Sequence, residues 1–244
     1  MIPRELLGTA QIPGGGELRL FRHNRDFMIL LERNELMSSR MAGSEEALAA
    51  MSCARIGARA RPQLLIGGDG MGFTLRAALA ALSADAGATV AELVPEIIDW
   101  ARGPMQDLTA GCLDDPRVRL LLGDVAELIR SSPAAFDAIL LDVDNGPDGL
   151  VRQANDRLYS EPGLRAAKAA LKPGGVLAIW SAARDDAFAR RLKRAGFTVE
   201  EVAVRARENG KGAKHIIWFA GLAPANSAAI SIRRPTEERA HVQR

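Results

Sequence analysis

The pattern of apolar and polar positions divides the chain at about residue 60. From Gln63 to about Phe219, short runs rich in Val, Ile and Leu alternate with segments of helical periodicity. This alternation predicts an α/β domain with a doubly wound, mostly parallel, seven-stranded sheet and helices on both faces. The predicted strands are 63–67, 88–92, 118–122, 137–142, 175–181, 197–204 and 214–220, and the predicted helices are 73–83, 95–103, 124–131, 161–171 and 185–195.

The first 60 residues follow a different pattern. Apolar and charged side chains alternate over 17–22, and 26–32 is a second strand candidate after a polar turn, so we expect a β-hairpin. A helix is expected to follow, with Ser44 as its N-cap and acids in its first turn. Residues 223–244 lack periodicity and predict a flexible tail. We therefore expect three parts: a hairpin plus helix over 1–60, the α/β domain over 61–222, and the tail.

Composition and charge exclude several functional classes. The chain is 48% hydrophobic and 25% charged, with a net charge of +2 and no basic stripe interleaved with aromatic residues, so nucleic acid is not an expected partner. No apolar run is long enough to cross a bilayer, and no signal-peptide core is present, so we expect no membrane partner. Cys53 and Cys112 have no metal-type spacing, which predicts free thiols in a cytoplasmic protein without a metal site.

A glycine-rich turn follows the first predicted strand of the α/β domain. The turn is Gly67-Gly68-Asp69-Gly70, and a predicted helix begins at about Phe73. Such a turn is typical of a site for a nucleotide-derived ligand at the carboxyl end of a parallel strand. A carboxylate at Asp69 would repel a pyrophosphate but attract an ammonium or a sulfonium. The turn therefore predicts a positively charged nucleoside ligand.

Acidic residues stand at the ends of successive predicted strands. Glu92 ends the second strand, Asp124 follows the third, and Asp142 and Asp144 follow the fourth. Alone, Glu92 could be a surface acid and Asp124 a helix N-cap. Ligands of an open α/β sheet bind beyond the carboxyl ends of its strands, so we expect these acids to converge on one site. Glu92 could accept ribose hydroxyl protons, Asp124 an adenine amino hydrogen, and Asp142 and Asp144 would lie near the reactive end.

These motifs resemble those of the spermidine synthase (polyamine aminopropyltransferase) family, whose members have the Rossmann-like fold of S-adenosylmethionine-dependent methyltransferases. The resemblance covers about residues 15–205. The corresponding segments are Gly67-Gly68-Asp69-Gly70 for the family's G-G-G-D-G, Glu92-Leu93-Val94 for E-x-D, Gly123-Asp124 (followed by Val125) for G-D, 136–142 for F-D-x-I-x-x-D, and 170–177 for A-L-K-P-G-G-V-L.

The resemblance implies a transferase that uses decarboxylated S-adenosylmethionine, or S-adenosylmethionine itself, as co-substrate and transfers an aminopropyl group to a small-molecule amine. By the same resemblance Asp69 would hold the aminopropyl ammonium, Glu92 the ribose and Asp124 the adenine. Asp142 would act as base on the attacking amine, with Asp144 beside it. The sequence leaves open whether the N-terminal hairpin forms the interface of a homodimer.

The chain departs from the family on the acceptor side. The family's D-S-S-D-P stands here as 142–147, with Asn145 in place of the second aspartate, and its Y-H-E or Y-Q-E stands as Ser44-Glu45-Glu46 without the tyrosine. The segments for the nucleoside are intact. Two alternatives therefore stay open: an S-adenosylmethionine-dependent methyltransferase, and a non-catalytic homologue that kept the nucleoside-binding fold.

Overall fold

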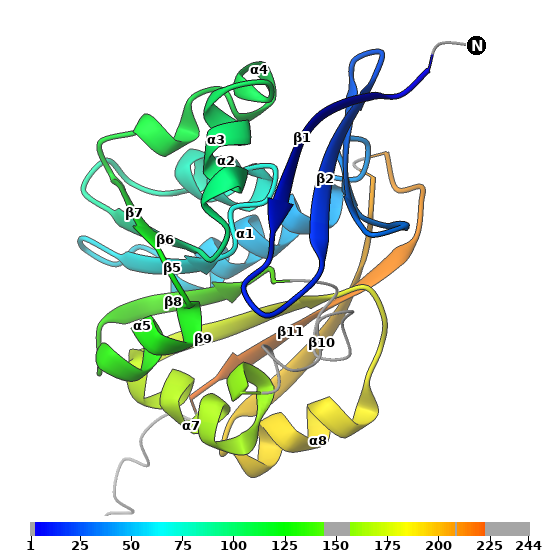
Figure 1. The fold of residues 1–244 in the computed structure, drawn as a ribbon. Helices are drawn as coiled ribbons and strands as arrows, with labels where there is room; N and C mark the ends of the chain where they lie inside the picture. The colour runs from blue at the N-terminus through cyan, green and yellow to red at the C-terminus, as the bar shows by residue number, and fades with distance from the viewer. Residues whose placement is uncertain (1–2, 144–156, 208, 223–244) are drawn as a thin grey trace, which may run out of the picture.

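A computed structural model describes residues 3–143, 157–207 and 209–222 of the 244-residue chain, and it contains two sheets (Figure 1). The smaller sheet is antiparallel, with the order β1-β2-β3-β4. Its strands are β1 (Glu5–Gln11), β2 (Glu17–His23), β3 (Asp26–Leu31) and β4 (Asn34–Ser38). The predicted hairpin of β2 and β3 is confirmed, whereas β1 and β4 were not predicted. A register shift between Leu6 and Gly8 interrupts the alternation of β1, and β4 has only five residues.

The larger sheet has seven strands in the order β10-β11-β9-β8-β5-β6-β7. Strands β5 to β9 run parallel, and β11 pairs antiparallel with both β9 and β10, so the predicted α/β fold with an antiparallel closing hairpin is confirmed. The strands are β5 (Gln63–Gly67), β6 (Gly87–Glu92), β7 (Val118–Leu122), β8 (Phe136–Leu141), β9 (Leu171–Ser181), β10 (Thr198–Arg205) and β11 (Lys214–Gly221).

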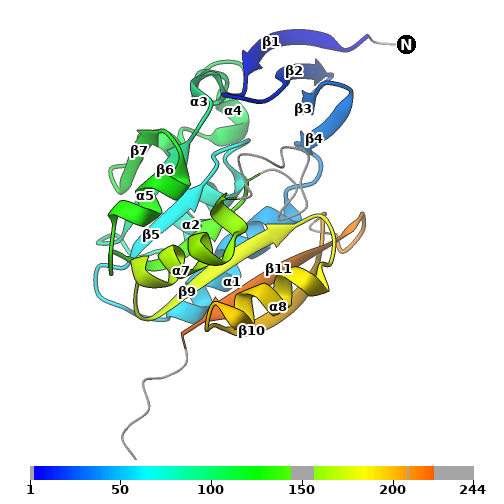
Figure 2. The ribbon, with the colours of Figure 1, turned by 60° about the horizontal axis from the view of Figure 1, so that its bottom comes forward.

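Helices cover both faces of this sheet. One apolar cluster packs α5, α7 and α8 against it, and a second packs α1, α2 and α3 against the opposite face (Figure 2). The helices are α1 (Gly43–Ile56), α2 (Phe73–Ala81), α3 (Pro95–Arg102), α4 (Gln106–Thr109), α5 (Val125–Ser131), α7 (Glu161–Ala170) and α8 (Asp186–Arg194), with a 3-10 turn at Cys112–Asp114. No helix in the described ranges combines the length and apolar character that a bilayer crossing requires.

The start of α1 differs from the prediction. The N-cap is Ala42, which provides no side-chain hydrogen bond, so the prediction of Ser44 as N-cap is wrong. Ser44 is instead the second residue of the helix, and its Oγ lies 2.8 Å from His215 Nδ1 in β11. The Ser44 hydroxyl therefore contacts β11 and does not cap the helix. By its packing, α1 contributes to the core of the larger sheet, while the boundary near residue 60 stays a prediction. The predicted tail, 223–244, lies outside the described residues.

The smaller sheet packs on α3 through a third apolar cluster, which includes Leu20 and Ile29 from the strands and Ile97 and Trp100 from the helix. The approach is close at Gly8, where a Cβ atom would lie 2.5 Å from Trp100 Nε1. Figure 2 shows the β1–β4 sheet above the edge of the larger sheet at which β5 and β6 end. The packing therefore places an apolar layer over the carboxyl ends of the parallel strands, where ligands of such sheets bind.

Candidate active site

A cavity lies between the smaller sheet and the carboxyl ends of β5, β6, β7 and β8. The smaller sheet and the β1–β2 turn contribute only apolar side chains to it, among them Ile12, Leu18 and Met37. The opposite wall carries the charged groups, which are Glu92, Asp124 and Asp142. Neither Lys, Arg nor His occurs among the described residues that line the cavity. The predicted convergence of these three acids is thus observed, and the charged side chains in the described part of the lining are all acidic.

The glycine turn passes through a narrow space on this wall. Gly68 has a φ of +85°, and a Cβ atom there would lie 2.6 Å from the backbone oxygen of Asp142. Gly70 has a φ of +57°, and a Cβ atom would lie 2.7 Å from Met37 Cε. Both the backbone conformation and the space therefore require glycine at Gly68, whereas at Gly70 the positive φ requires it and the flexible end of Met37 could move. Gly67 does not line the cavity; its oxygen accepts from Asp142 N at 3.1 Å, joining the ends of β5 and β8.

Glu92 connects the glycine turn to the end of β6. Its Oε2 accepts from Asp69 N and its Oε1 from Val94 N, each at 2.9 Å. The side chain is buried, and burial raises its pKa, although these backbone N–H groups act in the opposite direction. Because each carboxylate oxygen can accept more than one hydrogen bond, Glu92 can hold the turn and still accept from ribose hydroxyls.

Asp69 is buried, and its carboxylate has no hydrogen-bond partner among the described residues. Its side chain is 6% exposed, and neither oxygen accepts a hydrogen bond from any described residue. Burial and then the charge of Glu92 raise its pKa to about 7, against the opposing effect of Arg102. The two neighbouring glycines line the cavity, whereas Asp69 itself does not. A role in holding an ammonium stays a prediction, and the missing partners show that the carboxylate is not satisfied within the described protein.

Asp142 stands directly after β8 and lines the cavity. Thr74 Oγ1 donates to Asp142 Oδ2 at 2.8 Å. Burial raises the pKa of Asp142 to about 6, and the Thr74 hydrogen bond limits that rise. A carboxylate that titrates this close to neutrality is suited to accept a proton at physiological pH. Asp144, the second predicted catalytic residue, lies outside the described residues.

Asp124 serves as the N-cap of α5 and also lines the cavity. Its Oδ1 accepts from Ala126 N at 2.7 Å, so the cap interpretation is correct, and the residue also lines the cavity. Gly123, Val125 and Leu93, which were predicted to bind the nucleoside, line the same cavity. The part that each would take in binding stays a prediction.

Glu45 is an acid whose place beside this site sequence reasoning missed. It lies in the first turn of α1 with 9% of its surface exposed, and Oε2 has no hydrogen-bond partner among the described residues. Burial, followed by the negative charges of Asp142 and Glu46, raises its pKa well above the ordinary value. The signal was its position in the segment that stands where the family has Y-H-E or Y-Q-E. The sequence alone explained it as an acid favourable to the helix dipole.

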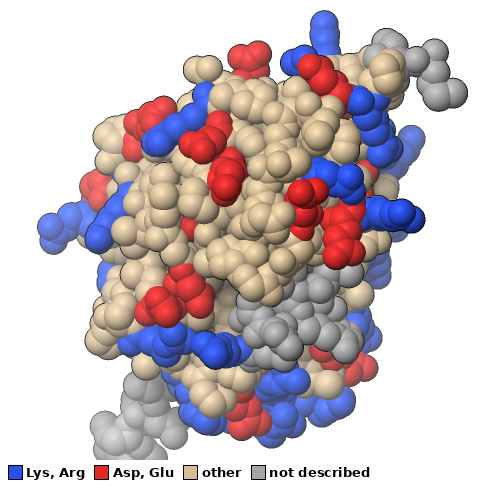
Figure 3. All heavy atoms as spheres, in the orientation of Figure 1, with Lys and Arg blue, Asp and Glu red and all other residues tan. Residues whose placement is uncertain are grey.

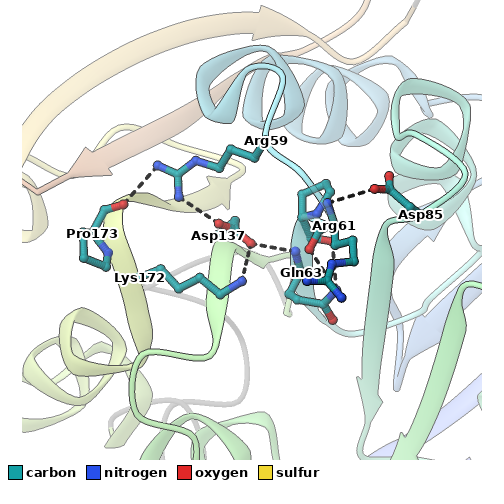
Figure 4. Close-up of polar contacts among 8 residues, drawn as sticks. Arg59, Arg61, Gln63, Asp85, Asp137, Lys172 and Pro173 are labelled. Atoms are coloured by element: carbon teal, nitrogen blue, oxygen red, sulfur yellow. Dashed lines mark hydrogen bonds and ion pairs between the residues drawn. The ribbon is translucent and has the colours of Figure 1, made fainter.

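Asp137, at the amino end of β8, shows the opposite environment. Its carboxylate accepts from Arg59 at 2.8 Å and from Lys172 and the backbone N–H of Gln63, each at 2.7 Å (Figure 4). Burial would raise the pKa of Asp137, but these donors bring it below the usual value. Asp137 is thus a structural residue that ties β8 to the loop before β5 and to β9.

In the described ranges, no cluster of His, Cys, Asp and Glu side chains could hold a metal ion. Cys53 and Cys112 are buried free thiols, as predicted.

Comparison with known proteins gives partial sequence matches to polyamine aminopropyltransferases. The chain is 34% identical over 123 residues to polyamine aminopropyltransferase 2 of Pseudomonas aeruginosa, which covers 49% of this chain and 33% of that protein. It is 38% identical over 91 residues to the polyamine aminopropyltransferase of Mycobacterium tuberculosis, which covers 36% of this chain and 17% of that protein. The chain thus spans a third or less of the length of these two curated relatives.

The fold is similar to that of solved spermidine synthases. The crystal structure of the Thermotoga maritima enzyme superposes with a TM-score of 0.70 at 20% identity, over 90% of this chain and 74% of that one. A spermidine synthase in complex with the transition-state analogue AdoDATO gives a TM-score of 0.69 at 20% identity, over 90% and 73%. The family profile described as the spermine/spermidine synthase domain matches residues 44–185, more than half of the 244 residues, and the chain belongs to this family.

Proposed function

We propose that this protein transfers an aminopropyl group from decarboxylated S-adenosylmethionine to a small-molecule amine. The observation that carries the proposal is the acidic lining of the cavity, in which Glu92, Asp124 and Asp142 face no basic side chain among the described lining residues. Decarboxylated S-adenosylmethionine carries a sulfonium and an ammonium and no carboxylate. S-adenosylmethionine would bring its carboxylate into a wall of like charge, which disfavours it.

In the proposed reaction the nucleoside lies across the ends of β5, β6 and β7. Glu92 accepts hydrogen bonds from the ribose hydroxyls, Asp124 accepts from the adenine amino group, and Asp69 holds the ammonium of the aminopropyl chain. The amine nitrogen attacks the methylene carbon next to the sulfonium, and the carbon–sulfur bond breaks with its electron pair on sulfur. The products are the new secondary amine and neutral 5′-methylthioadenosine.

Asp142 acts as the base in this scheme. The acceptor amine is protonated at neutral pH, so it must lose a proton before its lone pair can attack. A carboxylate whose pKa is raised to about 6 can take that proton and is mostly ionised at pH 7. Its negative charge also stabilises the positive charge that develops on the attacking nitrogen. The names of the curated relatives and the complex of a solved relative with a transition-state analogue support this reaction class.

Calorimetry with decarboxylated S-adenosylmethionine, S-adenosylmethionine and 5′-methylthioadenosine tests the proposal. We expect the decarboxylated form to bind at least about ten-fold more tightly than S-adenosylmethionine, which corresponds to about 1.4 kcal/mol. Release of methylthioadenosine on adding diamines or polyamines should follow. Equal or tighter binding of S-adenosylmethionine would favour the methyltransferase alternative. Donor binding without turnover of any amine would favour the non-catalytic one.

An Asp142→Asn variant provides the matched control for catalysis. We expect it to bind the donor nucleoside while losing turnover, because the amide cannot accept the proton. A cytoplasmic location and a homodimer stay expectations from the sequence. Basic and acidic side chains are interspersed over the face shown in Figure 3, and the expectation that nucleic acid is not a partner stays a prediction.

A further inference from the structure

The connection between β5 and α2, residues 67–74, contacts Asp142 at its backbone and at its side chain. The Asp142 N–H donates to Gly67 O at 3.1 Å, and its carbonyl oxygen is the atom that a Cβ of Gly68 would meet at 2.6 Å. At the other end of the connection, Thr74 Oγ1 donates to Asp142 Oδ2 at 2.8 Å. Among the described residues, Thr74 is the hydrogen-bond donor to this carboxylate. One short connection therefore fixes both the main chain and the carboxylate of Asp142.

Thr74 is itself held firmly by packing. It is the second residue of α2 and is 2% exposed. Phe73 before it packs in the cluster below the smaller sheet, and Leu75 after it packs in a cluster on the larger sheet. A threonine in a helix has few rotamers, and its hydroxyl often donates to a carbonyl of the preceding turn. Here the single hydroxyl proton is donated to Asp142 instead.

The neighbouring elements do not supply a cation that could take over the task of Thr74. No described Lys, Arg or His lines the cavity with Asp142. The titratable groups of these elements at this end of the sheet are acids, namely Glu45 of α1, Asp69 of the glycine turn, Glu92 of β6 and Asp124 before α5. Like charges disfavour the ionised form of Asp142, and burial does so too. The hydrogen bond from Thr74 lowers its pKa against these effects.

We propose that Thr74 is the positioning residue of the base, because its hydroxyl orients the Asp142 carboxylate so that Oδ1 accepts the proton of the attacking amine. This inference rests on the proposed function, in which Asp142 is the base. With Oδ2 engaged by Thr74, the lone pairs of Oδ1 are the ones left for the amine. The proton passes from the amine nitrogen to Oδ1, and Thr74 keeps its own proton throughout. The hydrogen bond also favours the ionised carboxylate, which is the form that can accept a proton.

Thr109 offers a matched comparison with a purely structural threonine. It is also 2% exposed, and its Oγ1 donates to Ala101 O at 2.9 Å. Its methyl group would lie 3.3 Å from a Cβ on Gly72, the N-cap of α2, so the two threonines are buried beside the same helix start. The Thr109 hydroxyl, however, is bound to a backbone carbonyl. Its loss should lower stability without changing the titration of Asp142.

Kinetics of Thr74→Val, Thr74→Ser and Thr109→Val between pH 5 and pH 9 test the proposal, with decarboxylated S-adenosylmethionine as donor and 1,4-diaminobutane as acceptor. Valine keeps the shape of threonine but cannot donate, so we expect kcat at pH 7 to fall about ten-fold or more. The apparent pKa of kcat/KM should rise by about one pH unit, while the Kd of the donor stays unchanged. Thr74→Ser restores the hydroxyl and should recover kcat to within about three-fold, and Thr109→Val should keep the wild-type profile.

Carbon-13 NMR of the free protein gives a readout that needs no turnover. The carboxyl signal of Asp142, assigned by its loss in Asp142→Asn, should titrate with a pKa of about 6 in the wild-type protein and about one pH unit higher in Thr74→Val. Thr74→Ala takes the place of Thr74→Val if circular dichroism shows that the latter does not fold.

The two failures can be told apart. If the wild-type protein turns over the diamine but Thr74→Val has the same kcat, pH profile and Asp142 titration, the inference is wrong and the proposed function stands. A loss of stability alone, as expected for Thr109→Val, would equally overturn the inference. If the wild-type protein does not turn over any amine, the proposed function fails, and the NMR titration still decides whether Thr74 controls the ionisation of Asp142.

Discussion

Two buried aspartates of the same sheet should respond in opposite directions to the same substitution. Asp69 is 6% exposed and has no hydrogen-bond partner among the described residues, whereas Asp137 is 3% exposed and accepts from Arg59, Lys172 and Gln63. Replacing each by Asn removes a buried charge without a described hydrogen-bond partner in the first case and a fully paired charge in the second. We predict that Asp69→Asn becomes more stable relative to the wild-type protein as pH rises, and that Asp137→Asn is destabilised at neutral pH.

The magnitude for Asp69 comes from its pKa. A rise from 3.8 to about 7 corresponds to about 4 kcal/mol of lost stability once the carboxyl is ionised in both states. Because the folded-state pKa is the higher one, the penalty is absent below about pH 4, grows as pH rises, and is complete above about pH 7. The unpartnered amide of Asn has a cost of its own, about 1–3 kcal/mol, that does not change with pH. The quantity to test is therefore the pH dependence of the stability difference between the two proteins. Between pH 5 and pH 8, the free energy of unfolding of Asp69→Asn should rise by about 2–3 kcal/mol relative to that of the wild-type protein.

For Asp137 the sign is reversed. Its folded-state pKa lies below the usual value, so its contribution is present above the unfolded-state pKa and is lost as pH falls through the folded-state pKa. The substitution leaves Arg59 and Lys172 without their carboxylate. Their side chains are 29% and 31% exposed and regain some hydration. We therefore expect the free energy of unfolding to fall by about 3 kcal/mol at pH 7, which is the lower end of the range for breaking a buried ion pair.

Urea unfolding at pH 5 and pH 8, followed by circular dichroism, measures both effects. The slope m should stay the same in the variants, so that midpoints report stability. The reasoning would be refuted if the stability of Asp69→Asn relative to the wild-type protein did not change between the two pH values, since the Asp69 carboxylate would then be hydrated or paired. A loss at pH 8 as large as that of Asp137→Asn would refute it equally.

Three further predictions concern the glycine turn, the base and the junction of the sheets. Gly68→Ala should weaken donor binding about ten-fold or more in calorimetry, because its Cβ would lie 2.6 Å from the Asp142 oxygen, whereas Gly14→Ala, with similar φ and open space, should leave binding unchanged. The kcat/KM for the amine should rise with pH through an apparent pKa near 6, because only ionised Asp142 accepts a proton; a flat profile would exclude it as base. Gly8→Ala should lower stability by about 1–3 kcal/mol in thermal unfolding, since its Cβ would meet Trp100 at 2.5 Å; an unchanged Tm would contradict the close approach.

Several strands and helices of the α/β domain were predicted well from the sequence. The bounds of β5 and β7 coincide with the predicted 63–67 and 118–122, and α2 and α3 begin at the predicted Phe73 and Pro95. These segments carry continuous apolar runs or clear helical periodicity, and both patterns are local. The smaller sheet was only half predicted, because the irregular β1 and the short β4 are defined by pairing with β2 and β3. Pairing between strands is a tertiary property that alternation alone does not reveal.

In the site, too, the features that depend on local sequence patterns could be predicted, and those that depend on packing between elements could not. Glu92, Asp124 and Asp142 could be predicted to meet, because parallel strands place their carboxyl ends at one edge whatever the loops do. The apolar wall that includes Met37 could not, since it depends on how the smaller sheet packs on α3. Glu45 was missed for the same reason: an acid in the first turn of a helix is ordinarily solvated. Here, α1 packs against the larger sheet, and Glu45 is buried with 9% of its surface exposed.

Buried acids have different hydrogen-bond partners at the two ends of the larger sheet, and this difference bears on function. At the amino end of β8, Asp137 is matched by two cations and a backbone N–H, so the free protein already satisfies it (Figure 4). At the carboxyl ends, Asp69 and Glu45 are buried, and no described residue pairs with the Asp69 oxygens or with Glu45 Oε2. Such groups reduce the stability of the free protein and persist in sites where a ligand supplies the missing charge. The ammonium of the proposed donor, bound near Asp69, would supply the charge that this carboxylate lacks among the described residues.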